Sequence, residues 1–337
     1  MRRLIEHIER SWTAHRETGE RGASTILVAM SMVVMLGFTA LAIDVGAMYH
    51  ERAELQSGAD AAVLAVAQDC GMGVNCTGPA AHPTAQQYAE KNAKDGAVNV
   101  AEPVFTGSTV RVNVSTRAQS GAGSLALTFA PILGVNEATV GATSAAQVIT
   151  PNKGPAVLPI VISPCDFDPS LSAGPQVLKL HSITGSNKNA TECGKKSATS
   201  GLNIPGGFGF IDTPSSTVCT TTVSVDQTAT SDPGNDLPSQ CEAVLQQHVG
   251  KTILLPLYKD LGASGNKGWY KIDGWVAFKL LGWRFPSTSY ANTTHSGATC
   301  SNPCTGIIGE FEKFASIDSG FTSGGPDYGA SVVTMIE

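Results

Sequence analysis

The sequence has 337 residues, which is enough for one large or two ordinary domains with hydrophobic cores. Only 15% of the residues are charged, against about a quarter in typical domains, and the formal net charge of -6 is spread along the chain. No basic cluster outside the N-terminal region could neutralise a row of phosphates. The composition therefore excludes nucleic acid as an expected partner.

An uncharged, aliphatic stretch extends from Ala23 to Ile43. As a helix rising about 1.5 Å per residue it reaches about 30 Å, the thickness of a bilayer's hydrocarbon core. Only Arg52 follows the stretch closely, whereas five arginines precede it: Arg2, Arg3, Arg10, Arg16 and Arg21. The positive-inside rule then predicts a single-pass cell-membrane protein with a cytoplasmic tail over 1–22, a transmembrane helix over 23–43 and an extracytoplasmic remainder.

The helix is expected to stay as an anchor. Ala40-Leu41-Ala42 resembles a signal-peptidase site, which leaves a secreted product starting at Ile43 as the alternative. Against cleavage, the apolar run is longer than the usual signal core of about 7 to 15 residues. The helical pattern also continues without proline to Val66, and we expect the helix to end near Gly71.

All eight cysteines follow the apolar stretch, on the side predicted to be oxidising. An even number in that compartment indicates disulfides rather than zinc, since only one cysteine pair has ligand-like spacing. Local pairing is favoured because each pair encloses a polar, turn-rich segment. The expected bonds are Cys70 with Cys76, Cys165 with Cys193, Cys219 with Cys241 and Cys300 with Cys304.

The rest of the sequence indicates an α+β fold. After the long helix, a short polar helix is expected over 84–94 and strands over 98–104, 109–115 and 138–149, so that an external helix-plus-sheet module occupies 44–150. The turn-rich segment 151–155 marks a boundary. Beyond it, a mostly β, disulfide-containing domain is expected over 151–337, with strands over 156–163, 177–180, 252–258, 270–281 and 331–336.

Residues 41–67, LAIDVGAMYHERAELQSGADAAVLAVA, together with the preceding Arg21-Gly22, resemble the N-terminal module of TadE/G-like proteins of Tad/Flp pilus assembly. Segments 129–134 and 138–142 resemble the end of that module, so the resemblance covers about 21–148. It implies a bacterial envelope protein with a pilin-like helix-plus-sheet module, and no reaction. Two positions depart from the family pattern. Prepilin-like members have a glutamate about five residues after the processing glycine, whereas this chain has Leu27 at that position after Gly22. The segment from Asp212 to Ser216 lacks the spacing of the metal site found in another branch of the family.

One face of the long helix could contact partner helices. Its residues are Asp44, Tyr49, Leu55, Ala59, Ala62 and Val66. The alternative for the apolar positions is packing on the chain's own sheet, which we favour because amphipathic helices followed by strands usually close a core in cis. For Asp44 we favour a solvated carboxylate at the headgroup boundary.

Three tryptophans lie close together at Trp269, Trp275 and Trp283. In a regular strand, Trp275 and Trp283 would share one face, opposite the better core row of Val276, Phe278 and Leu280. Exposed tryptophans could bind envelope glycan, whereas buried ones would belong to the core of the sheet.

The sequence gives little support for catalysis. Nucleophile-elbow, zinc-protease and phosphate-loop patterns do not occur, and His181, His248 and His295 are expected to be solvated surface residues. The segment Asp232 to Asp236 is expected to be an Asx turn and not a calcium loop. No cofactor or metal is therefore expected.

These observations favour a non-catalytic, single-pass envelope protein that anchors or assists assembly of a Tad/Flp-type pilus or secretion apparatus. Its expected partners are the lipid bilayer and pilus-assembly or envelope proteins. A surface adhesion or cell-wall glycan-binding module is the alternative, and an extracytoplasmic hydrolase ranks third. The sequence does not identify the partner or the role of 151–337.

Overall fold

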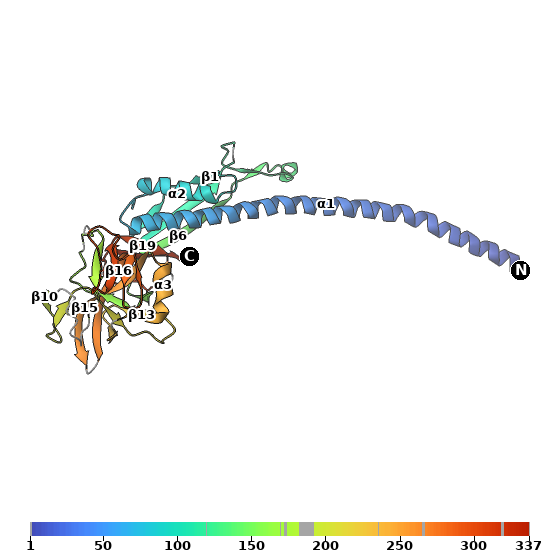
Figure 1. Ribbon diagram of the computed structural model, residues 1–337. Coiled ribbons are helices and arrows are strands. Elements are labelled where there is room, and N and C mark those ends of the chain that lie inside the picture. The colour runs from blue at the N-terminus through green and yellow to red at the C-terminus, as the bar shows by residue number, and fades with distance from the viewer. Residues whose placement is uncertain are drawn as a thin grey trace. The chain divides into compact units, whose positions relative to one another are not determined.

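The computed structural model describes residues 2–118, 120–168, 170–171, 174–181, 192–234, 236–264, 267–317 and 320–336 (Figure 1). Before Ser24 it describes the helical backbone and not the side chains. The chain divides into two compact units. Unit 1 comprises Met1–Ala59, Gln86–Ala101 and Asn113–Thr143. Unit 2 comprises Asp60–Ala85, Glu102–Val112 and Ser144–Glu337.

Helix α1 is one uninterrupted helix from Arg2 to Gly71, so the predicted long rod is confirmed and the N-terminal tail continues it (Figure 1). The second helix, α2 (Gly78–Asn92), starts six residues before the predicted Thr84. Within unit 1, α1 and α2 approach closely at Gly58, where an added Cβ would lie 3.3 Å from the carbonyl oxygen of Ala89. Glycine is less favourable than alanine inside a helix, but the missing side chain at Gly58 gives the two helices room to pack closely.

Unit 1 also contains two small strand pairs. Strand β1 (Val98–Val100) pairs antiparallel with the second half of β3 (Thr109–Thr116). Strands β4 (Leu125–Ala126) and β5 (Glu137–Ala138) form a short antiparallel ladder. The segment between them contains the 3-10 helix η1 (Ala130–Leu133). We call residues 125–138 the η1 loop.

In unit 2, a hairpin joins β2 (Val104–Thr106) to the first half of β3, with Gly107 in the turn at a φ of 60°. Strand β6 (Gly141–Ile149) pairs antiparallel with β20 (Ala330–Ile336), which also pairs in parallel with β19 (Phe314–Ile317). The strand expected at the end of the chain therefore exists, and its partner is β6, far away in the sequence.

The larger sheet of unit 2 has the order β14-β12-β8-β15-β16-β18-β9, and β17 pairs with β16. Its centre is the long hairpin of β15 (Thr252–Ser264) and β16 (Lys267–Arg284), both longer than predicted. The remaining members are β8 (Ile160–Ile162), β9 (Gln176–Lys179), β12 (Phe208–Ile211), β14 (Thr228–Asp232), β17 (Ser289–Tyr290) and β18 (Gly306–Phe311).

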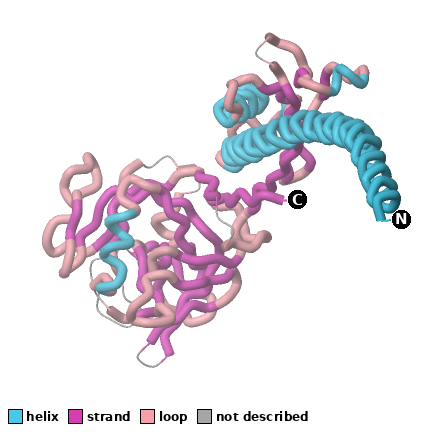
Figure 2. Tube along the Cα trace, turned by 90° about the vertical axis from the view of Figure 1, so that its right-hand side faces the viewer, coloured by secondary structure: helices cyan, strands magenta, loops and turns pink. Residues whose placement is uncertain are grey.

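Shorter elements make up the rest of this part of the chain, which Figure 2 shows as mostly strands and loops. They are the pairs β7 (Lys153–Ala156) with β13 (Thr221–Ser224) and β10 (Glu192–Lys196) with β11 (Asn203–Pro205), then η2 (Ser239–Cys241) and α3 (Glu242–Gln247). The α+β class is therefore confirmed: a long apolar helix is followed by a mostly β fold.

Strand β16 is buried on both faces. Trp275 packs with Tyr258 and Tyr270 in one core cluster, whereas Phe278 and Trp283 belong to another. The register shift between Leu280 and Gly282 is a bulge, and it moves Trp283 to the face opposite Trp275. The predicted shared face of these two tryptophans is therefore wrong, because an irregular strand does not keep the period of two.

All eight cysteines form the four predicted local disulfides: Cys70–Cys76, Cys165–Cys193, Cys219–Cys241 and Cys300–Cys304. Cys219 and Cys241 are buried in the larger core cluster, so their bond holds the β13 and α3 regions against the sheet. Cys300 is also buried, in a small separate cluster, and Cys165 and Cys193 pack against the other large core cluster. The structure therefore confirms the predicted pairing of neighbouring cysteines.

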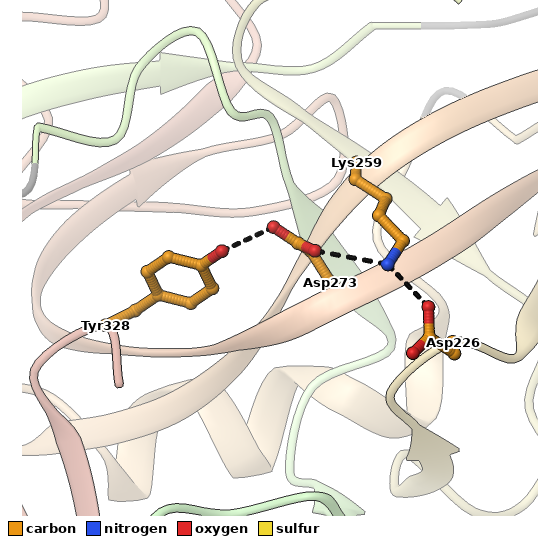
Figure 3. A network of polar contacts seen from close by, with 4 residues as sticks. All are labelled: Asp226, Lys259, Asp273 and Tyr328. Atoms are coloured by element: carbon orange, nitrogen blue, oxygen red, sulfur yellow. Dashed lines mark hydrogen bonds and ion pairs between the residues drawn. The ribbon is translucent and has the colours of Figure 1, made fainter. Parts of the chain in front are cut away.

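A polar network fixes the segment that leads into β20 (Figure 3). Lys259 Nζ of β15 lies 2.5 Å from Asp226 Oδ1 and 3.4 Å from Asp273 Oδ1 of β16. Tyr328 Oη donates to the other oxygen of Asp273 at 2.5 Å. Burial first, and then the Asp273 carboxylate, raise the pKa of Tyr328 to about 12, so its hydroxyl remains a donor at all physiological pH values.

Candidate functional site

The apolar part of α1 is exposed along its whole length. Every residue from Ser24 to Thr39 is exposed, including Leu27, Met35 and Phe38. Within the described residues, Ser24–Gly71 is the one helix long and apolar enough to cross a bilayer, and its most apolar window is not buried at all. Such a surface is stable in lipid and unfavourable in water, which agrees with a single-pass membrane helix.

Asp44 lies at the end of this apolar surface and is only 3% exposed. Its Oδ1 accepts the backbone N–H of Thr128 at 2.8 Å, and its Oδ2 accepts those of Phe129 at 2.9 Å and Ala130 at 2.6 Å. All four residues belong to unit 1. The expected solvated carboxylate is therefore wrong, because the side chain is buried beneath the start of η1.

The electrostatics of this contact favour an ionised Asp44. Burial alone raises the pKa of the carboxyl, but the three N–H donors lower it, and the net pKa lies below the ordinary value. A carboxylate with three convergent backbone donors is an acceptor that caps several orphan N–H groups at once. Asp44 therefore joins the η1 loop to the membrane end of α1.

The η1 loop lies along the apolar helix. Its side chains Phe129, Ile132 and Leu133 line an apolar pocket of about 310 Å³. The opposite wall belongs to α1 and consists of Val34, Gly37, Phe38, Ala40 and Leu41. Ile132 is 84% exposed and Leu133 is 70% exposed, so large apolar side chains point outward beside the membrane segment.

The other residues of the predicted partner-helix face differ in their exposure to solvent. Leu55, Ala59, Ala62 and Val66 are buried within the chain itself, whereas Tyr49 is 71% exposed. The buried four are therefore covered by the chain's own fold. Tyr49 is the position on this face at which a large side chain is available to a partner.

The three tryptophans do not form an exposed platform. Trp275 and Trp283 are buried, and the indole nitrogen of Trp275 donates to the carbonyl oxygen of Asn152 at 3.1 Å. Trp269 is half-buried, and its ring covers Gly262, where an added Cβ would lie 2.5 Å from ring atoms. The interpretation of this row as a glycan platform is therefore wrong for Trp275 and Trp283.

The histidines have structural partners. His181 is buried, not solvated as expected: Nδ1 lies 2.7 Å from the carbonyl oxygen of Gly206, and Nε2 lies 3.0 Å from Tyr270 Oη. Because that carbonyl can only accept, Nδ1 has the proton and Nε2 accepts from the tyrosine. His248 contacts the carbonyl oxygen of Val244 at 2.7 Å. These contacts orient the two rings, and the group beside His181 Nε2 is the Tyr270 hydroxyl, whose burial raises its pKa well above the ordinary value.

Metal binding finds no support in the part of the chain that the structure describes. Groups of three or more His, Cys, Asp or Glu side chains that could hold an ion are absent there. Asp232 Oδ1 accepts the N–H of Gly234 at 2.9 Å, which is the Asx turn expected for this segment.

Residues 22–69 match the family model described as putative Flp pilus-assembly TadE/G-like. The matched segment contains the exposed apolar helix, Asp44 and the start of the buried part of α1. It lies within the region in which the sequence resembled this family, so that resemblance is confirmed. No curated protein and no solved structure matches the chain. The match supports a pilus-assembly-related role and contacts with pilus or envelope proteins.

Proposed function

We propose that this chain is a non-catalytic, single-pass envelope protein that anchors or assists assembly of a Tad/Flp-type pilus or secretion apparatus. The main support is one continuous helix, α1, whose exposed apolar part enters lipid and whose buried part enters the folded region. The family match over 22–69 covers both parts of that helix. A helix that continues from the bilayer into the fold can anchor the folded region at the membrane.

The orientation proposed is N-terminus cytoplasmic and the bulk of the chain extracytoplasmic. The arginines before residue 23 support it through the positive-inside rule. The four disulfides, all after the apolar segment, support an oxidising compartment for the folded region. The proposed partners are the bilayer and assembly proteins that contact exposed positions such as Tyr49.

The proposed division of the chain is a tail over 1–22, a transmembrane helix over 23–43, a helix-plus-sheet module over 44–150 and a β-rich domain over 151–337. The adhesion alternative loses the exposed tryptophan row on which it depended. A hydrolase would need an activated nucleophile beside a base. His181 contacts the Tyr270 hydroxyl, whose pKa is raised by burial, and His248 contacts a backbone carbonyl oxygen, so neither ring supports that function.

A deletion and complementation experiment in the source bacterium tests the proposal. Deleting the gene should abolish sheared surface pili or the secreted products of the apparatus, and the full-length gene should restore them. A variant in which 1–43 is replaced by a cleavable signal peptide should be exported but fail to restore assembly, because it lacks the anchor. Normal pili in the deletion strain would refute the proposal.

The N-terminus of the mature protein tests anchor retention separately. Intact mass should show that the arginines before Ala23 are still present. A mature start at Ile43 would refute the anchor, whereas a start at Ala23 would show prepilin-type processing despite Leu27.

A further inference from the structure

We propose that the η1 loop is a second membrane-inserting element, which enters the outer leaflet beside α1 and places Ile132 and Leu133 among lipid acyl chains. The proposal rests on the membrane anchoring in the proposed function. It goes beyond that function because it assigns a lipid contact to a segment about ninety residues away from the anchor in the sequence. Every residue used below belongs to unit 1.

The depth of the loop follows from the residues that it faces. The α1 wall of the pocket extends from Val34 to Leu41, which are part of the apolar stretch that ends before Asp44. At about 1.5 Å per residue, these positions lie roughly 5 to 15 Å inside the boundary at Asp44. Half of a hydrocarbon core is roughly 15 Å thick, so a loop beside these residues lies in one leaflet.

The composition of the loop suits that depth. Residues 125–135, LALTFAPILGV, contain no charged side chain, and Asn136 and Glu137 follow only where the chain returns. Two of its largest apolar side chains, Ile132 and Leu133, are also its most exposed. In water this arrangement would leave an apolar patch unprotected, whereas in lipid it gains the free energy of burial.

Most backbone N–H groups of the loop have hydrogen-bond acceptors within the protein. Backbone polar groups without a partner are costly in the hydrocarbon region, so the N–H groups of the loop need acceptors at this depth. The N–H groups of Thr128, Phe129 and Ala130 donate to Asp44, and Pro131 has none. Internal carbonyl oxygens accept the N–H groups of Leu127, Ile132, Gly134 and Val135 at 3.0 to 3.2 Å. Asp44 therefore supplies the acceptor for three N–H groups of the loop.

Lipid is the occupant favoured for the apolar pocket because one of its walls is the candidate membrane span itself. A neighbouring protein helix would fill the same groove in an assembled apparatus, and the experiment below distinguishes it. Acyl chains need no complementary polar group, and the lining residues offer only apolar side chains and small residues such as Gly37 and Ala40.

The test uses the full-length protein in phosphatidylcholine nanodiscs with an environment-sensitive NBD probe on one introduced cysteine. The native cysteines are all disulfide-bonded in the structure, so labelling is selective. The test position is Leu133→Cys. Met32→Cys, on the exposed apolar part of α1, is the control in the bilayer, and Lys94→Cys, exposed near the end of α2, is the control in water. All three positions are exposed, and variants are used only if their unfolding midpoint equals that of the wild type.

We expect blue-shifted NBD emission at Leu133 and Met32 and strong quenching of both by lipids with a doxyl group on the acyl chain, with neither effect at Lys94. Quenching at Met32 without quenching at Leu133 would overturn the loop insertion while the anchor stands. A blue shift at Leu133 without lipid quenching would also overturn it, because protein would then cover the loop. Absence of quenching at Met32 would refute the anchor, and the loop insertion with it.

Discussion

Replacing Trp275 separates its structural role from the sequence-based hypothesis of an exposed binding tryptophan. Its ring is fully buried, packs edge-to-face on Phe321 at 5.0 Å and donates its N–H to Asn152. Trp275→Ala should destabilise unit 2 by about 3 to 5 kcal/mol, because it leaves a large cavity and loses the hydrogen bond. Trp275→Phe retains an aromatic ring and should cost clearly less, with the lost hydrogen bond contributing about 1 kcal/mol and the smaller ring leaving a smaller cavity.

The assay is thermal and urea unfolding of the full chain in detergent, followed by near-ultraviolet circular dichroism. For a unit of this size, about 4 kcal/mol corresponds to a fall in Tm of roughly 10 °C. Trp269→Ala is the matched control, and a half-buried ring should cost clearly less than a buried one. A wild-type Tm for Trp275→Ala, together with loss of binding to cell-wall glycan, would refute the assignment of this residue to the core.

Three further predictions concern the disulfides, His181 and Asp44. Removing Cys219–Cys241 by double alanine substitution should lower the free energy of unfolding by about 3 kcal/mol, because the bond closes a long loop, and removing Cys300–Cys304 should lower it by about 2 kcal/mol. Equal unfolding midpoints for the two variants would contradict this ranking. Burial lowers the pKa of His181 from 6.5 to about 4. The stability that its neutral form provides is therefore complete above pH 6.5, and the free energy of unfolding should fall by roughly 3 kcal/mol as the pH drops toward 4. In unfolding measured across that range, His181→Gln should remove this contribution to the slope. Asp44→Ala should leave three N–H groups of the η1 loop without their acceptor. Limited proteolysis in detergent should then cut within 125–138 faster than in the wild type. An unchanged cleavage rate would contradict the capping role.

Features set by local sequence were predictable. The period of α1 and its end at Gly71 depend on neighbouring residues and were predicted correctly. Disulfide pairing was also predictable, because each bond joins cysteines that are close along the chain. The family match to 22–69 confirmed the module recognised from the same local pattern.

Features that depend on distant pairing were missed. The partner of β20 is β6, and alternation within β20 gives no information on which edge it joins. The bulge after Leu280 moved Trp283 to the other face, and one inserted residue in a strand leaves no clear sequence signal. The burial of His181 depends on Gly209, where an added Cβ would collide with Tyr270 Oη, a spatial relation that spacing along the chain does not show.

Asp44 shows why the site itself could not be located from the helix alone. A carboxylate at the end of an apolar helix is ordinarily solvated, and that expectation changes only if donors arrive from elsewhere. Here the donors come from residues 128–130, which lie just before and at the start of η1 (Ala130–Leu133), where N–H groups have no helical partner. The uncharged run 125–135 was the available sequence signal. Beside a membrane helix, such a run needs either water or an internal acceptor, and Asp44 is the acceptor that allows it to lie beside lipid.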